Sequence, residues 1–200
     1  MKHKYIFLFL ITSVIACTQQ PTSKTNHIES ELKMLTTDKL KKEYLEQIFV
    51  DDQKVRGSEG QELMIKYGKN SIEHNDYINR QIRQDSINLE KIEKYLMMHG
   101  YPNKSFGDRA TTTPWVVIHH SQRLDSRRRN FKIIYEAYLD DKIDDNDISF
   151  YLGRMYQMKF GERLRMRRPY KSHDEIDKLI SELDLLQIKQ EVINNKGKSE

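Results

Sequence analysis

The sequence predicts an all-α, single-domain helical bundle of about six helices, and three observations lead to this fold class. Apolar residues recur at spacings of three and four along most of the chain. No stretch of the sequence shows the alternation of apolar and polar residues that is typical of a half-buried strand. Charged residues make up 32% of the chain and hydrophobic residues 37%, which indicates well-solvated helices around a small core.

The first residues predict export and lipid attachment. Lys2 and Lys4 precede an apolar run that ends at Ala16 and is too short to span a membrane as a mature helix. The following Cys17 completes Ser-Val-Ile-Ala-Cys, which resembles a bacterial lipobox. The resemblance implies that residues 1–16 are a signal peptide and that Cys17 carries diacylglycerol and a further acyl chain, enough for stable anchoring. The alternatives are an ordinary signal peptide or an uncleaved anchor.

The position after the lipobox favours the outer membrane, because residue 18 is Thr rather than the Asp that retains many lipoproteins in the inner membrane. Cys17 is the only cysteine, so the chain has no internal disulfide. We expect residues 17–36 to be the lipidated residue and a flexible tether, residues 37–193 the helical domain, and residues 194–200 a disordered tail.

The charge of the chain argues against nucleic acid as a partner. Removing Lys2 and Lys4 takes the formal net charge from +4 to +2, which is too mild for that role. The partners that we expect are the membrane, through the anchor, and either a small polar ligand or another envelope protein. The glycines form no phosphate-binding motif, and no cofactor is predicted.

The helices follow from caps and apolar spacing. Thr37 can cap a helix that runs to Val55, and residues 59–67 form a short helix. Asp52 lies one turn from Arg56 in the first of these, so the two can pair. Later helices are expected from Asp125, from Asp145 or Asn146, and over 172–193, with an irregular basic segment at 161–172 that could contact anionic lipid headgroups.

The longest helix is predicted over residues 71–98 and carries an acid on its apolar stripe. The stripe consists of Ile78, Ile82, Asp85, Leu89, Ile92 and Leu96. An unpaired buried carboxylate costs several kcal/mol, so Asp85 needs donors from neighbouring helices. The possible donors are Arg56, His119 or His120, and Arg154.

The segment 99–121 holds the only tryptophan and two adjacent histidines. Its helix begins either at Asp108, with a kink at Pro114, or at Thr113 as the cap, and we favour the second start. His119 and His120 point about 100° apart, so they cannot serve one centre. A zinc site would have to recruit Asp85, His99 or Asp125, and no metal site is predicted.

An ordered set of short motifs resembles the bacterial family of unknown function DUF6624. The set is Asp52-Gln53-x-x-Arg56, Asp85-x-x-Asn88, Gly100-Tyr101-Pro102 and Ile118-His119-His120-Ser121, within residues 40–165. The family has glutamine where His119 stands and an Asp-Arg pair where Gly153-Arg154 stands. The resemblance brings no known activity. It implies one polar cluster composed of Gln53, Arg56, Asp85, Asn88, His120 and Arg154.

Three hypotheses for function follow. The first is a lipid-anchored envelope protein that binds a small ligand or has a structural role. The second is an enzyme in which His120 acts as acid or base, Asp85 orients it, and Arg56 or Arg154 holds an anion. The third is an anchored subunit of an envelope complex.

Overall fold

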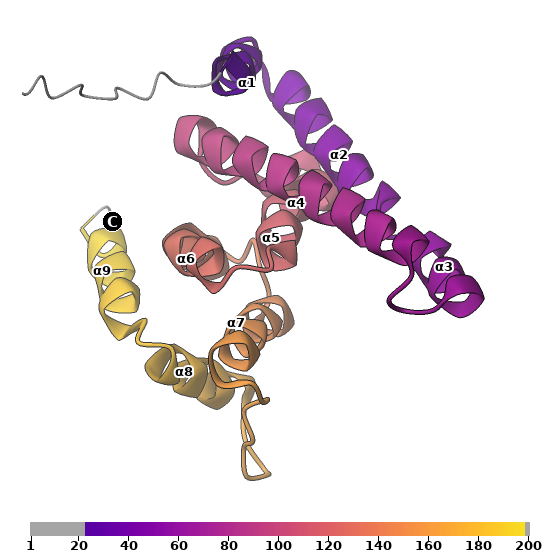
Figure 1. Cartoon of the computed structure of the whole chain (residues 1–200). Coiled ribbons are helices and arrows are strands. Elements are labelled where there is room, and N and C mark those ends of the chain that lie inside the picture. Colours follow the sequence, from indigo (N-terminus) through magenta and orange to yellow (C-terminus); the bar gives the residue numbers. More distant parts are fainter. Residues whose placement is uncertain (1–22, 199–200) are drawn as a thin grey trace, which may run out of the picture.

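The computed structural model describes residues 23–198, and within them it is all-α. The signal peptide and the lipidation site predicted at Cys17 lie outside the described residues. The elements are α1 (Ser23–Lys33), α2 (Asp38–Lys54), α3 (Glu59–Tyr67), α4 (Ile72–His99), a 3₁₀ turn η1 (Lys104–Phe106), α5 (Asp108–His120), α6 (Leu124–Leu139), α7 (Asp145–Phe160), α8 (Ser172–Glu182) and α9 (Leu186–Lys196) (Figure 1). No strand occurs in this part of the chain, which confirms the predicted fold class.

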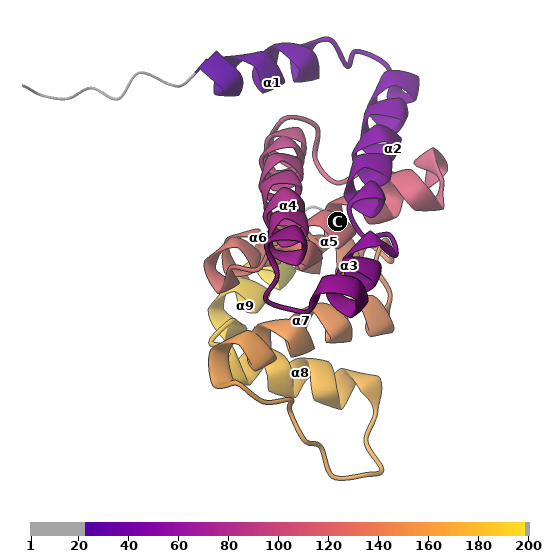
Figure 2. The same ribbon diagram turned by 45° about the vertical axis from the view of Figure 1, so that its right-hand side comes forward.

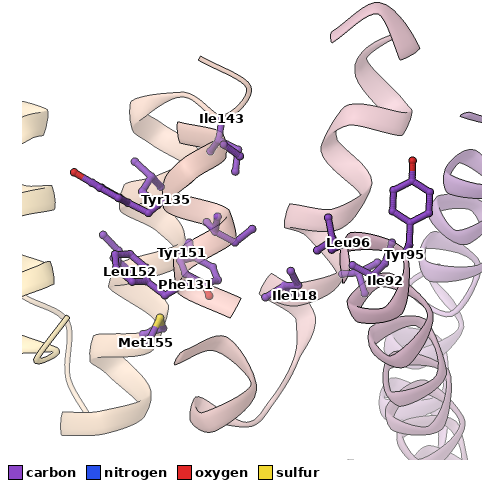
Figure 3. Packing of buried hydrophobic residues seen from close by; sticks show 14 of the residues in the cluster. Ile92, Tyr95, Leu96, Ile118, Phe131, Tyr135, Ile143, Tyr151, Leu152 and Met155 are labelled. Atoms are coloured by element: carbon purple, nitrogen blue, oxygen red, sulfur yellow. The ribbon is translucent and has the colours of Figure 1, made fainter. Parts of the chain in front are cut away.

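The helices pack in two groups that meet at α5 (Figure 2). The first group contains α2, α4 and α5, with α1 and α3 packed against the ends of α4. The second contains α6, α7, α8 and α9, in which α7 lies on α8 and α9 returns to α6. One hydrophobic cluster continues through both groups. Figure 3 shows its two sides, Ile92 and Leu96 of α4 beside Ile118 of α5, and Phe131 of α6 beside Tyr151 of α7.

The expected tether contains a helix that belongs to the domain. Residues 23–33 form α1, in which Ile28 and Leu32 are buried in the common core. Lys94 of α4 holds Glu29 at 3.3 Å, which fixes α1 across that helix. The prediction of a tether up to residue 36 was wrong here, because two apolar residues one turn apart are a weak signal in a polar stretch. At the other end, α9 runs to Lys196 rather than ending at residue 193.

The long helix is confirmed as α4, but its buried stripe differs from the predicted one. Ile82 is 49% exposed, whereas Tyr77, Asn88 and Tyr95 are buried. Asp85 is largely buried at the edge of the stripe. The helix therefore turns a more polar face to the core than its apolar pattern indicates, because Asp52 of α2, Arg56 just after α2 and His120 of α5 lie on that side.

Two predicted helix boundaries were wrong. The helix at 108–120 begins at Asp108 and keeps Pro114 inside it, rather than starting after Thr113. The hydroxyls of Thr111 and Thr113 donate to the carbonyls of Gly107 and Arg109, so side chains reinforce the turns around the proline. The last predicted helix is two helices, α8 and α9, because the chain turns at Asp184 with a positive φ of 57°.

Within residues 23–198, no helix combines the length and the apolar character that crossing a membrane requires.

Candidate functional site

Four ionisable side chains from three helices meet where α2, α4 and α5 cross. Asp52 belongs to α2, Arg56 follows the end of α2, Asp85 lies midway along α4, and His120 is the last residue of α5. We call these four residues the Asp52 cluster. The helix positions explain why they converge, because Asp52 and Arg56 are one turn apart and both face the crossing.

Asp52 is the centre of the cluster. Its side chain is fully buried, and both carboxylate oxygens have donors. His120 Nδ1 lies 3.0 Å from each of the two oxygens. Gln53 Nε2 donates to Oδ2 at 2.8 Å, and Arg56 Nη1 is 3.1 Å from Oδ1. A buried carboxylate with this many donors is compensated, as physical chemistry requires.

Arg56 joins the two carboxylates. Its Nη1 also donates to the Asp52 carbonyl at 2.6 Å, and its Nη2 donates to Asp85 Oδ1 at 2.5 Å. Burial raises the pKa of Asp85 above its usual value, while the hydrogen bond from Arg56 opposes that rise. The structure thus gives Asp85 the cationic partner that its position on the helix predicts.

His120 contacts Asp52, not Asp85, and this corrects the predicted pairing. With Nδ1 occupied by a carboxylate, the imidazole donates there, and its Nε2 remains available as an acceptor. The His120 side chain is 26% exposed, so the ring is only partly shielded from solvent. The sequence carried a signal for Asp52 as strong as the one for Asp85, because Asp52 also replaces an apolar residue on a helix stripe.

The other three residues of the predicted polar cluster, Gln53, Asn88 and Arg154, differ in how they relate to Asp52. Gln53 adjoins the cluster through its hydrogen bond to Asp52. Asn88 lies one turn along α4 from Asp85, is fully buried and accepts from Gln84 Nε2 at 2.8 Å. Its Nδ2 has no partner within the described residues. Arg154 does not join them, because it lies on α7 and donates to Gln157 at 2.9 Å. The implied six-residue cluster is therefore incomplete at Arg154.

His119 points about 100° away from His120 around α5, although the two rings meet edge-on with centroids 6.0 Å apart. Its ring stacks on Trp115 at 5.1 Å and on Phe150 of α7 at 4.5 Å. Burial, with help from the nearby Arg127, lowers the pKa of His119 to about 3. His119 is thus a neutral aromatic member of the core, as the angle between adjacent helical residues predicts for one of the two histidines.

A cavity of about 230 Å³ opens beside the Asp52 cluster, between α4 and the connection from α5 to α6. Asp85 forms part of its wall, together with Ser121, Gln122 and Arg123. Ser121 follows His120 directly in the chain. The cavity therefore places hydroxyl, amide and guanidinium groups next to a carboxylate, a set that suits a small polar molecule.

The described residues contain no candidate metal site, and no similar protein indicates what the cluster does. Among residues 23–198, no three side chains of the types His, Cys, Asp and Glu gather so that they could hold a metal ion. Comparison of the chain with protein-family models, with curated proteins and with solved structures finds no match.

Proposed function

We propose that the chain is a lipid-anchored protein of the bacterial cell envelope whose helical domain binds a small polar ligand beside the Asp52 cluster. The observation that carries the binding role is that the His120 imidazole is held by a fully buried carboxylate and yet is 26% exposed. Asp52 holds His120 through Nδ1 at 3.0 Å, which leaves Nε2 to meet a ligand from the accessible side.

The surrounding groups support a polar ligand of modest size. The adjoining cavity of about 230 Å³ has Asp85, Ser121, Gln122 and Arg123 in its wall, which offers both donors and acceptors. A wholly structural network would be sealed from water, whereas the His120 side chain is 26% exposed.

The test is a thermal-shift survey of amino acids, small carboxylates, phosphates and sugars with the wild-type chain and with His120→Gln. We expect at least one compound to raise the Tm of the wild type and to leave the Tm of the variant unchanged. His119→Gln is the matched control, because it alters the neighbouring histidine, which stacks on Trp115 and Phe150 and makes no contact with Asp52, and it should keep the compound's effect. Compounds that act equally on wild type and His120→Gln would contradict the proposal.

A second candidate function, acid–base catalysis, is favoured by the contact between His120 and Asp52. A carboxylate on Nδ1 fixes the tautomer of an imidazole and stabilises it when Nε2 takes a proton from a substrate. In this role Asp52 is the positioning residue and Arg56 neutralises part of its charge. Compounds found in the survey would be incubated with the protein and followed for turnover, and Asp52→Asn should abolish turnover while leaving binding measurable.

The support for the envelope location comes from residues 1–18 of the sequence. The lipobox ends at Cys17, and the Thr at position 18 favours the outer membrane. Cys17→Ser should move the protein from the membrane fraction to the soluble fraction of the envelope. Retention of the variant in the membrane fraction would contradict lipid anchoring without affecting the proposal about the ligand.

A further inference from the structure

A second cavity lies in the other half of the molecule, between α7, α8 and the basic segment 161–171 that joins them. Its volume is about 240 Å³. Figure 2 shows the segment extending from the end of the domain that is remote from α1. This cavity shares no lining residue with the one beside Asp85, so what it binds is independent of the function proposed above.

Two arginines in the wall of this cavity form no ion pair with an acid among residues 23–198. Arg154 donates to the neutral amide of Gln157, and Arg163 forms no hydrogen bond or ion pair to any described residue. The one acid in the wall, Glu175, accepts a hydrogen bond from Ser149 at 3.2 Å. The basic segment adds Arg165, Arg167 and Arg168, all exposed, so the electrostatic potential around the cavity favours an anion.

The rest of the wall is apolar. Phe150 of α7 is 61% exposed, and Leu164 and Leu179 complete the lining on the side of the segment and α8. An exposed phenylalanine beside two arginines is a surface that can contact an apolar group while the guanidinium groups bind a charged one.

Gly153 gives an independent indication that the cavity has a use. It lies inside α7, where glycine is less favourable than alanine by about 1 kcal/mol. No side chain lies within 4 Å of the position that its Cβ would occupy, and its φ is not positive, so neither packing nor backbone geometry requires glycine. Because Gly153 has no side chain, its place in the cavity wall is open space.

We propose that this cavity binds an organic anion that carries an apolar group, with Arg154 and Arg163 on the carboxylate or phosphate and Phe150, Leu164 and Leu179 on the apolar part. The volume admits a molecule about the size of one aromatic ring with its anionic group, which is smaller than typical drug-sized ligands.

The test uses phenyl phosphate as the probe, titrated into a chain that begins at residue 18 and so keeps every described residue. Binding is followed by NMR shifts of the amides in α7, α8 and the basic segment. Inorganic phosphate and phenol are the two comparison probes, since each offers only half of the proposed ligand. We expect phenyl phosphate to bind with a Kd on the order of 1 mM or tighter, and each comparison probe to bind at least about tenfold more weakly.

Three variants locate the binding. Arg154→Met and Arg163→Met should each weaken phenyl phosphate at least about tenfold, because each removes a charge-assisted hydrogen bond. Arg167→Met, at an exposed position outside the cavity, should leave the Kd within about twofold. Gly153→Leu should abolish binding by filling the cavity while raising the Tm, since leucine favours the helix.

The Tm rise separates a blocked cavity from a misfolded protein. Undiminished binding to Gly153→Leu, equal loss in Arg154→Met and Arg167→Met, or equal affinity for inorganic phosphate would each overturn the proposal, as would the absence of shifts with phenyl phosphate.

Discussion

His119 and His120 are neighbours in the sequence, yet their side chains lie in very different environments. His120 meets the buried carboxylate of Asp52 at 3.0 Å and stays partly exposed. His119 is 8% exposed, stacks between Trp115 and Phe150, and has its pKa lowered to about 3. The difference arises from a rotation of about 100° along the helix, which turns one ring toward acids and the other toward aromatic rings.

The same contrast holds for the charges around the two histidines. On the His120 side, Arg56 pairs with two carboxylates. Next to His119, the Arg127 side chain is 1% exposed. It donates hydrogen bonds to the carbonyls of His119 and Ser121 and so caps the C-terminal end of α5. Burial lowers the pKa of Arg127 to about 10. One arginine thus neutralises buried acids, whereas the other satisfies backbone carbonyls, and substitutions should distinguish these roles.

The largest effect is expected from Asp52→Ala. The variant leaves Arg56 and His120 without their common acceptor, and the loss of one partner from a buried ion pair lowers the free energy of unfolding by about 3–5 kcal/mol. Urea denaturation at neutral pH measures the change. Asp51→Ala is the control, because this neighbouring carboxylate accepts a hydrogen bond from Gln47 at the surface and should change stability by less than about 1 kcal/mol. Equal losses in the two variants would remove Asp52 from the centre of the cluster.

Arg127→Met tests the other side of α5 and should have a smaller effect. The carbonyls of His119 and Ser121 lose their donor, but the variant also removes a buried guanidinium that has no acidic partner in the described part of the chain. We expect the free energy of unfolding to fall by about 2 kcal/mol. Arg128→Met, which removes bonds to Leu183 and Asp184 at the surface, should lower it by about 1 kcal/mol or less. A stabilised Arg127→Met would show that burial of the charge outweighs its bonds.

The lowered pKa of His119 predicts a specific loss of stability in acid. The folded protein favours the neutral ring of His119. The contribution of this residue to the free energy of unfolding is therefore complete above the unfolded pKa of about 6.5 and is lost as the pH falls toward 3. At pH 5 the loss amounts to about 2 kcal/mol, from 1.36 kcal/mol per pH unit. His119→Phe keeps the stacked ring but cannot be protonated, so its stability should fall less between pH 6.5 and pH 5. Parallel curves for the two proteins would show that His119 is not the group that titrates.

These comparisons indicate how far the sequence alone can lead. The helices α2, α3 and α4 follow from Thr37, Gly68 and Gly100 as local caps and stops, which need no tertiary information. Pairing of Asp52 with Arg56 also follows from spacing within one helix. The partner of His120 lies 68 positions away in the chain, and its choice between Asp52 and Asp85 depends on how α2 and α4 rotate against α5. The local periodicity of the sequence does not determine how these helices rotate against one another.

The smallest effect is expected from Asp85→Asn, and it tests whether Asp52 or Asp85 is central. Asparagine keeps an acceptor for Arg56 Nη2, and it removes a carboxylate whose pKa burial has raised. The raised pKa means that the folded state holds the proton more tightly than the unfolded state, so ionised Asp85 opposes folding increasingly as the pH rises above about 4. The variant should therefore lie within about 1 kcal/mol of the wild type at pH 7. Its stability relative to the wild type should improve from pH 4 to pH 7 in matched denaturation curves. A loss as large as that of Asp52→Ala would instead make Asp85 the residue on which the packing of α2 and α4 depends.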